Sequence, residues 1–285
     1  MDSPNLPIVR TVPALRARLQ AWRERRERIA LVPTMGALHE GHLSLIRLAR
    51  AQAERVVCSI FVNPKQFGPA EDLDAYPRQE DADARLLAQE RCDLIYAPAA
   101  EAIYPPGFAT TVSVAGPSAG LDGDARPGHF DGVATVIAKL LLQSAPDVAV
   151  FGEKDYQQLL VIRRLAADLD LTTEILSAPT ARADDGLALS SRNAYLSEDE
   201  RRVAGRLNKV LKEIAGAVAR GAPVEQAEAV GREGLQQAGF EPVDYFEVRA
   251  AADLRRFEGK ADRPARVFAA AFLGKTRLID NWPVE

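Results

Sequence analysis

Two histidines lie three positions apart in a short segment that also contains two glycines. The segment, residues 33–42, reads Pro-Thr-Met-Gly-Ala-Leu-His-Glu-Gly-His. Gly36 and Gly41 allow the backbone to approach a phosphate closely, and the N–H groups at a helix start attract anions. The imidazoles of His39 and His42 can both reach one phosphate chain. The segment therefore predicts a loop that binds a nucleotide and assists transfer of its nucleotidyl group.

Two other interpretations of this histidine pair compete with nucleotide binding. A His-x-x-His pair can bind zinc, but no third ligand stands nearby and the four-residue spacing of zinc proteases is absent. The two histidines could also be ordinary loop residues. The form His-x-Gly-His resembles the signature of the nucleotidyltransferase and class I aminoacyl-tRNA synthetase superfamily, and this resemblance favours nucleotidyl transfer.

Two further segments carry polar side chains beside predicted elements. Residues 61–67 read Phe-Val-Asn-Pro-Lys-Gln-Phe, and the amides of Asn63 and Gln66 can both donate and accept hydrogen bonds. Such groups suit a substrate with hydroxyls and a carboxylate, although alone the segment is best explained as an Asn-Pro turn. Residues 126–132, Arg-Pro-Gly-His-Phe-Asp-Gly, lead into a buried helix.

Two later segments could complete a phosphate site. Residues 151–158 read Phe-Gly-Glu-Lys-Asp-Tyr-Gln-Gln, in which Lys154 can meet a phosphate and Asp155 can accept from a ribose hydroxyl. Alone, this segment could be an ordinary helix start with a charged first turn. Residues 189–193, Leu-Ser-Ser-Arg-Asn, place two hydroxyls before the guanidinium of Arg192, a combination that suits a triphosphate.

The first two-thirds of the chain alternates apolar runs with amphipathic helical patterns. This alternation predicts a mostly parallel sheet covered by helices on both faces, an α/β Rossmann-like domain. Ligands of such sheets bind beyond the carboxyl ends of the strands, which is where the polar segments fall. Strands are predicted at 29–32, 56–62, 93–96, 148–151 and 172–176, a short extended piece at 110–114, and helices at 11–28, 43–53, 77–89, 133–142 and through Leu160 and Leu165.

The pattern changes near residue 180. A capping box at residues 197–200, Ser-Glu-Asp-Glu, begins a long helix, which Gly-Ala-Pro at 221–223 ends before a second helix reaches Gln237. Strands are predicted at 243–248, 266–272 and 276–279. This order predicts a second, smaller α+β domain, with the boundary within residues 178–186. We therefore divide the chain into domains 1–181 and 182–285.

Composition limits the possible partners and location. The 285 residues carry a net charge of −4 with Lys and Arg spread along the chain, so no global basic excess points to a nucleic-acid partner. No apolar run approaches the roughly 20 residues that a membrane helix needs, and residues 1–10 lack the apolar core of a signal peptide. Cys58 and Cys92 fit reduced core positions. We expect a cytoplasmic protein with no membrane partner.

Together and in this order, the five segments resemble those of the pantoate–β-alanine ligase family. The resemblance covers about residues 8–196 closely and the remainder more loosely. It implies ATP with Mg²⁺ and a homodimer whose subunits carry a C-terminal lid. It also implies that pantoate and β-alanine condense to pantothenate through a pantoyl adenylate, with release of AMP and pyrophosphate. The motifs that carry the resemblance are Pro-Thr-Met-Gly-Ala-Leu-His-Glu-Gly-His, Phe-Val-Asn-Pro-x-Gln-Phe, Phe-Gly-Glu-Lys-Asp-Tyr-Gln-Gln and Leu-Ser-Ser-Arg-Asn.

The resemblance assigns roles by matching position. His42 is implied as the acid, and His39, Lys154 and Arg192 as further catalytic groups. Pantoate would be held by Gln66 and Gln158 with Asn63 beside them, and Gln66 would also border the path of β-alanine. Position 181 is often a larger aliphatic residue in the family, and some members carry Met at 189. The implied ATP-binding set is Met35, Gly36, Ala37, Leu38, His39, Glu40, Gly41, His42, Gly152, Glu153, Lys154, Asp155, Ala181, Leu189, Ser190, Ser191 and Arg192.

Several questions stay open at this level. The ligands of Mg²⁺ are unknown; Asp81 and Asp83 are acidic candidates, but a solvated helix face explains them equally well. A lid that excludes water is expected at residues 190–192, hinged at 185–186. Two other functions compete: a nucleotidyltransferase that acts on another small substrate and keeps the nucleotide on its product, and a nucleotide-binding sensor without catalysis.

Overall fold

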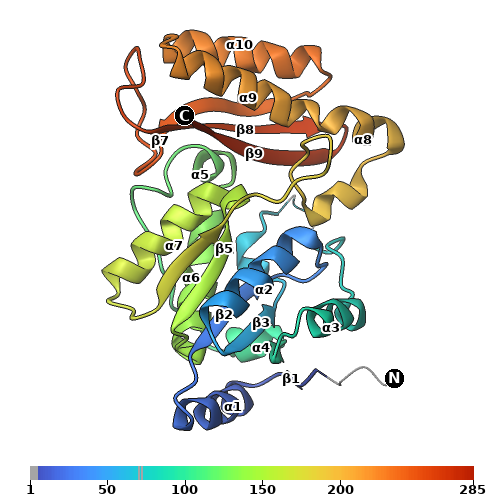
Figure 1. Ribbon diagram of the computed structural model, residues 1–285, viewed down its shortest axis with the longest axis vertical. Coiled ribbons are helices and arrows are strands. Elements are labelled where there is room, and N and C mark those ends of the chain that lie inside the picture. The colour runs from blue at the N-terminus through green and yellow to red at the C-terminus, as the bar shows by residue number, and fades with distance from the viewer. Residues whose placement is uncertain (1–5, 70, 72) are drawn as a thin grey trace.

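The computed structural model describes residues 6–69, 71 and 73–285, so the first five residues of the predicted domain 1–181 lie outside the described part. Two bodies, each built on its own sheet, lie one above the other in Figure 1. The larger sheet is parallel, in the order β1-β4-β3-β2-β5-β6. Its strands span Ile8–Val9 (β1), Ile29–Thr34 (β2), Arg55–Ile60 (β3), Leu94–Tyr96 (β4), Val148–Gly152 (β5) and Glu174–Ala178 (β6).

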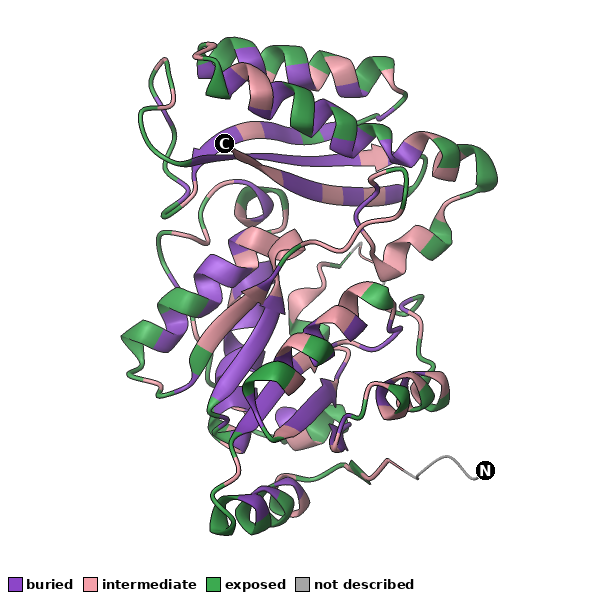
Figure 2. Cartoon of the chain, viewed as in Figure 1, coloured by how far each residue is buried: buried purple, intermediate pink, exposed green. Residues whose placement is uncertain are grey.

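Helices cover both faces of the large sheet, and Figure 2 shows its central strands as mostly buried. Successive strand residues point to opposite faces. Ile29 and Leu31 of β2 therefore pack in the cluster with α1, α6 and α7, whereas Ala30 and Val32 pack in the cluster with α2 and α3. Burial of each large apolar side chain stabilises the fold by about 1.5–3 kcal/mol. These helices span Val12–Glu24 (α1), Glu40–Gln52 (α2), Glu80–Gln89 (α3), His129–Ser144 (α6) and Tyr156–Asp168 (α7), with single turns at Ala100–Ile103 (α4) and Asp122–Ala125 (α5).

The α/β class predicted for this part of the chain is confirmed, with local differences. Strand β1, only two residues long, was not predicted because so short a run shows no periodicity. Helix α6 begins earlier than predicted, at His129, directly after Gly128 in a left-handed conformation with φ +82°. Residues 110–114, predicted to be extended, belong to no strand of the described chain.

The second body is a three-stranded antiparallel sheet with helices on one face, as predicted for the smaller α+β part. Apolar side chains of α9 and α10 pack with those of all three strands in one core cluster. Strand β9 extends past the predicted end at residue 279, and this extension brings Asp280 and Asn281 into the sheet. The elements span Glu198–Ala204 (α8), Arg206–Ala219 (α9), Val224–Gln237 (α10), Val243–Ala250 (β7), Ala265–Leu273 (β8) and Thr276–Val284 (β9).

The single long helix predicted after residue 197 is wrong, because two helices, α8 and α9, occupy this stretch. The capping box itself is confirmed: the Ser197 N–H donates to Glu200 Oε2 at 2.8 Å, and the Glu200 N–H donates to Ser197 Oγ at 3.3 Å. The helices separate at Gly205, where a Cβ atom would lie 2.9 Å from the carbonyl oxygen of Asp185. The linker residue Asp185 therefore lies close to the glycine at which the two helices separate.

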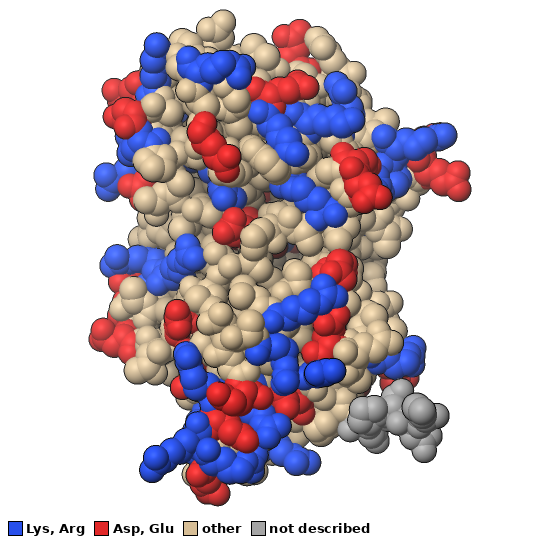
Figure 3. Space-filling model, viewed as in Figure 1, with Lys and Arg blue, Asp and Glu red and all other residues tan. Residues whose placement is uncertain are grey.

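The linker between the two sheets follows β6, and its residues contact both bodies. The division at residues 181 and 182 stays a prediction. No helix of the described residues is long and apolar enough to cross a membrane. On the face that Figure 3 shows, basic and acidic side chains are intermixed over both bodies.

Candidate active site

A cavity of about 450 Å³ lies where the two bodies meet. It is lined from the large sheet by the loops after β2, β3 and β5, and from the small sheet by β8 and β9. All the polar segments singled out in the sequence contribute to it. The predicted site residues that line the cavity are Met35, His39, Gly41, His42, Asn63, Gln66, Gly152, Lys154, Asp155, Gln158, Ala181, Leu189, Ser190, Ser191 and Arg192.

Five residues predicted to bind ATP do not line this cavity. Ala37 and Leu38 belong to the histidine loop and are themselves buried. Gly36 forms the turn of the same loop, with φ +82°. Glu40 is exposed and pairs with Arg47. The Glu153 carboxylate pairs with an arginine of β8. These five residues can shape the site through backbone position, but none of them lines the cavity, and the carboxylates of Glu40 and Glu153 pair with arginines instead.

The two loop histidines hold each other and the start of α2 in a fixed arrangement. His39 Nδ1 accepts the N–H of Gly41 at 3.1 Å, and His42 Nδ1 accepts the N–H of His39 at 3.3 Å. The ring centroids lie 4.1 Å apart. Because each Nδ1 accepts, each neutral ring carries its hydrogen on Nε2. The pair therefore offers two N–H donors from the wall of the cavity.

Both histidines are uncharged at neutral pH in the free protein. Burial, with a smaller contribution from the nearby Lys154 ammonium, lowers the pKa of His39 to about 4. Burial, His39 and Lys154 together lower the pKa of His42 to about 3. A neutral imidazole can donate a hydrogen bond, but it is not a cation. The geometry thus supports hydrogen-bond donation by His42, whereas the implied acid role needs a bound anion to raise its pKa.

The histidine loop is anchored from below by Asp83 of α3, which is 1% exposed. Its Oδ1 accepts the N–H of Leu38 at 2.8 Å, and its Oδ2 accepts the N–H of Ala37 at 3.0 Å. Ala37 has a φ of +51°, a conformation that a non-glycine residue adopts only when neighbours enforce it. A solvated helix face is therefore wrong for Asp83. Asp81, two positions earlier, is exposed as that interpretation expected.

The amides after β3 form a chain that ends on the cavity. Asn63 is 1% exposed, and its Nδ2 donates to Gln66 Oε1 at 3.0 Å and to the Gly132 carbonyl at 3.1 Å. Its Oδ1 accepts from the Tyr104 hydroxyl at 2.7 Å. The side-chain amide of Asn63 is thus hydrogen-bonded to other groups of the protein. Among the described residues, Gln66 Nε2 donates only to the weak thioether acceptor of Met35 at 3.1 Å, so this N–H group is well placed to meet a ligand.

Arg126 and His129 support Gln66 from its other side. His129 Nδ1 donates to the Gln66 carbonyl at 2.8 Å, and its Nε2 accepts from Arg126 at 3.0 Å. Arg126 also pairs with Glu71 at 2.6 Å. Burial and the Arg126 charge lower the pKa of His129 to about 4, which keeps the ring neutral and preserves this donor–acceptor pattern. The segment at 126–132, whose role was open, positions the Gln66 backbone.

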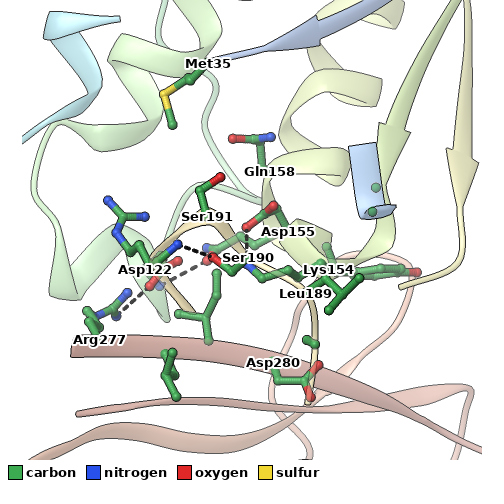
Figure 4. Close-up of a pocket in the computed structure, with 18 of the residues that line it drawn as sticks. Met35, Asp122, Lys154, Asp155, Gln158, Leu189, Ser190, Ser191, Arg277 and Asp280 are labelled. Carbon is green, nitrogen blue, oxygen red and sulfur yellow. Dashed lines mark hydrogen bonds and ion pairs between the residues drawn. The ribbon is translucent and has the colours of Figure 1, made fainter. Parts of the chain in front are cut away.

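The side chains suited to bind phosphate lie on the turn after β5 and on the linker. Lys154 Nζ lies 3.4 Å from Asp155 Oδ1. Ser191 Oγ donates to the Ala37 carbonyl at 3.0 Å, which ties the linker to the histidine loop. Lys154, Asp155, Ser190, Ser191 and Gln158 all line the cavity (Figure 4).

Residues of the small sheet also line the cavity, and sequence reasoning missed them. Arg277 of β9 pairs with Asp122 of α5 at 2.7 Å, and the Tyr245 hydroxyl donates to the same carboxylate at 3.1 Å (Figure 4). Asp280 and Asn281 lie farther along β9. The only local signal was a polar Asp-Asn pair interrupting the apolar run of this strand.

The parallel sheet, the histidine loop and the Lys154 turn beside it are features of an α/β enzyme that binds a nucleotide, and the second body lines the same cavity. A family model described as pantoate-beta-alanine ligase matches residues 7–283. The chain belongs to this family. The family membership predicted from the motifs is confirmed, and the match extends through the C-terminal part.

Individual relatives agree over nearly the whole chain. The pantothenate synthetase of Caulobacter vibrioides is 60% identical over 281 residues, covering 97% of this chain and 98% of the relative. That of Rhodospirillum rubrum is 55% identical over 276 residues, covering 97% and 98%. The crystal structure of pantothenate synthetase from Thermus thermophilus has a TM-score of 0.91 at 45% identity, covering 98% of this chain and 99% of that one.

A further solved structure carries ligands. The pantoate-beta-alanine ligase from Francisella tularensis, complexed with beta-gamma ATP and beta-alanine, has a TM-score of 0.82 at 32% identity. The alignment covers 98% of each chain. The α/β fold with a smaller antiparallel C-terminal sheet is thus shared with enzymes of this family.

Proposed function

We propose that this protein condenses pantoate with β-alanine at the expense of ATP, giving pantothenate, AMP and pyrophosphate. Membership of the family over residues 7–283 is the observation that carries the proposal. The cavity supports it, because the amides of Gln66 and Gln158 face the same space as Lys154 and the linker hydroxyls. Neutral amides suit the hydroxyls and carboxylate of pantoate, and the cation suits the phosphates of ATP.

In the first step, a pantoate carboxylate oxygen attacks the α-phosphorus of ATP, and the bond to the leaving pyrophosphate breaks. The carboxylate is already an anion, so no base is needed. The obstacle is electrostatic, because two anions must meet and charge grows on the pyrophosphate. The Nε2–H groups of His39 and His42, the Lys154 ammonium and the Arg192 guanidinium would stabilise that charge, with Ser190 and Ser191 beside them.

In the second step, the β-alanine amine attacks the carbonyl carbon of pantoyl adenylate. The bond from that carbon to the phosphate oxygen breaks, AMP leaves with the electron pair, and the amine nitrogen loses a proton. Water would hydrolyse the intermediate, so the site must be closed. The linker at 190–192 serves as the lid in this proposal. Gly186, with φ +92°, supplies the hinge beside Asp185.

Mg²⁺ is proposed to arrive with ATP. The described residues contain no group of three or more His, Cys, Asp or Glu side chains that could hold a metal ion. Phosphate oxygens and water would hold Mg²⁺ instead.

The proposed reaction is tested by its products. Purified protein supplied with ATP, Mg²⁺, pantoate and β-alanine should release AMP and pyrophosphate in equal amounts with pantothenate. A nucleotidyltransferase would release pyrophosphate while the nucleotide stays on its product, and a sensor would release neither. Either of those results would overturn the proposal.

Gln66→Ala should weaken use of pantoate far more than use of ATP. The variant removes the Nε2–H group beside Met35, so we expect the KM for pantoate to rise by about tenfold or more, the factor for one lost hydrogen bond to a charged group. Pantoate-dependent ATP–pyrophosphate exchange measures both KM values. Gln20→Ala, an exposed change on α1, is the matched control. An equal loss for both substrates would argue against a pantoate contact.

A homodimer is proposed with the segment 109–113 at the contact. These residues are mostly exposed, and they belong to no strand of the described chain. The segment contains Thr110, Thr111 and Val112, whose β-branched side chains favour strand pairing, here with the same segment of a second copy. Light scattering should give twice the chain mass of 31.0 kDa. A monomeric mass would refute this assembly.

A cytoplasmic location is also proposed. Cys58 and Cys92 are buried free thiols and form no disulfide, which fits a reducing compartment. Cell fractionation with an antibody to the protein checks this, and recovery outside the cytosolic fraction would contradict it.

A further inference from the structure

Strand β9 of the small sheet contacts the turn that carries Lys154. Asn281 is 2% exposed, and its Nδ2 donates to the carbonyl of Glu153 at 3.0 Å and to the carbonyl of Lys154 at 2.8 Å. One amide from the small body thus satisfies two consecutive carbonyls of the large body. These two hydrogen bonds fix the peptide groups on either side of Lys154, and so the position from which its side chain extends.

The orientation of the Asn281 amide is itself determined. Arg266 of β8 donates to Asn281 Oδ1, so Nδ2 must face the two carbonyls. The guanidinium lies 4.0 Å from the ring centre of Tyr156 and donates to Glu153 Oε2 at 3.2 Å. An amide flip would set an NH₂ group against a guanidinium, so the network permits one arrangement.

The preceding residue of β9 holds the linker in the same way. Asp280 is 3% exposed, and its carboxylate accepts hydrogen bonds from both terminal nitrogens of Arg182, at 2.7 and 2.9 Å. Its Oδ1 also accepts the Asn281 N–H at 2.7 Å. Arg182 directly follows Ala181, whose position lines the cavity. Two adjacent residues of one strand therefore connect the Lys154 turn to the linker.

From this geometry we infer that Asn281 is a positioning residue, which sets Lys154 for the ATP phosphates only while the small body is seated on the large one. The inference rests on the proposed ligase function. A buried network of this kind is sensitive to a single lost partner, and a displacement of about 1 Å at a reacting group is enough to slow catalysis strongly. Docking of the small body onto the large one therefore also places Lys154 in the phosphate site.

Asn281→Asp tests the inference with little change in shape. The carboxylate can still accept from Arg266, but it cannot donate and it faces two carbonyl oxygens. In pantoate-dependent ATP–pyrophosphate exchange we expect kcat/KM for ATP to fall by about tenfold to a hundredfold, in line with the loss of hydrogen bonds at a buried site. The KM for pantoate should change by less than about twofold.

Glu228→Gln is the matched control, an exchange between acid and amide within the same small body. Glu228 Oε1 accepts the Val248 N–H at 2.8 Å, away from the cavity. This variant should keep both KM values. If Asn281→Asp does not fold, as judged by its thermal unfolding, Asn281→Ser removes the same donors without adding a charge and takes its place.

A double-mutant cycle separates positioning from a general structural role. We expect Lys154→Ala and Asn281→Asp to each weaken ATP binding, measured with Mg²⁺–ATP and no pantoate. In the Lys154→Ala background, Asn281→Asp should have little further effect, because it acts through the missing ammonium. Effects that multiply to within about twofold would overturn the inference.

Failure of the inference differs from failure of the proposed function. If the unaltered protein forms no AMP from pantoate, β-alanine and ATP, the proposed function falls, while the ATP-binding cycle still judges the link between Asn281 and Lys154. If the unaltered protein is active and folded Asn281→Asp keeps its kcat/KM for ATP, only the inference falls.

Discussion

His42→Ala is expected to abolish pantoate-dependent ATP–pyrophosphate exchange while the protein stays folded. In the proposed reaction, the variant removes one of two Nε2–H donors at the site of charge growth, and the loss of one such donor costs about 10²–10³ in kcat. It also removes the acceptor of the His39 N–H at 3.3 Å, so that the neighbouring ring is less well held. We therefore expect a loss at the upper end of that range.

His42→Gln distinguishes hydrogen-bond donation from proton transfer. A glutamine amide can place an N–H near the position of Nε2, so it should recover part of the activity if His42 acts as a neutral donor. It should be as inactive as alanine if His42 must transfer a proton. Gln52→Ala, exposed at the other end of α2, is the control. Near-normal exchange in His42→Ala would refute any role in the first step.

The pH profile gives an independent check on the same residue. The pKa of His42 is lowered to about 3 by burial, His39 and Lys154, so the free protein keeps the neutral donor form above that pH. Because kcat/KM reports groups of the free protein, no loss of kcat/KM for ATP should occur near the model-peptide histidine pKa of about 6.5 as the pH falls. A midpoint at that ordinary value that disappears in His42→Gln would contradict a neutral donor.

The sequence was most informative where chemistry is local. The loop with His39 and His42 follows a strand, contains its own glycines and begins a helix, so its type and its place at the sheet edge could be predicted together. The strands around it could also be predicted, because buried parallel strands are continuous apolar runs. Even so, the neutral state of both imidazoles depends on burial and on Lys154, which is distant in the sequence, and no local pattern reports it.

The parts that could not be predicted depend on contacts between distant elements. Asn63 is predicted to bind substrate, and its hydrogen bonds to Gly132 and Tyr104 exist only because the fold brings these residues to it. The predicted helix breaks at Gly205, where Asp185 of the linker comes close. Asn281 reaches the Lys154 turn only where the two sheets meet. In each case an ordinary residue type acquires its role from packing.

Asp83 is the residue whose sequence interpretation changes most, and its replacement should show why. Asp83→Asn keeps the shape but leaves one oxygen, so an NH₂ group must face the N–H of Ala37 or Leu38 in a buried site. Leaving such a donor unsatisfied costs about 1–3 kcal/mol in the free energy of unfolding. The backbone at Ala37, with φ +51°, should then relax and displace His39 and the start of α2.

The expected result of Asp83→Asn is therefore a combined loss. Denaturant unfolding should show the lower stability, and pantoate-dependent exchange should fall by about tenfold to a hundredfold, since small displacements in a site lower rates strongly. Asp81→Asn, on the exposed face of the same helix, is the matched control and should leave both quantities unchanged.

The two roles considered for Asp83 predict different responses to metal. A loop anchor affects stability in the absence of any ligand, because its partners are backbone N–H groups of the protein itself. A magnesium ligand would instead leave unfolding unchanged and raise the Mg²⁺ concentration needed for half-maximal exchange. Unchanged unfolding with a shifted Mg²⁺ requirement in Asp83→Asn would thus overturn the anchor, because the buried carboxylate would then have to serve the ion and not the loop.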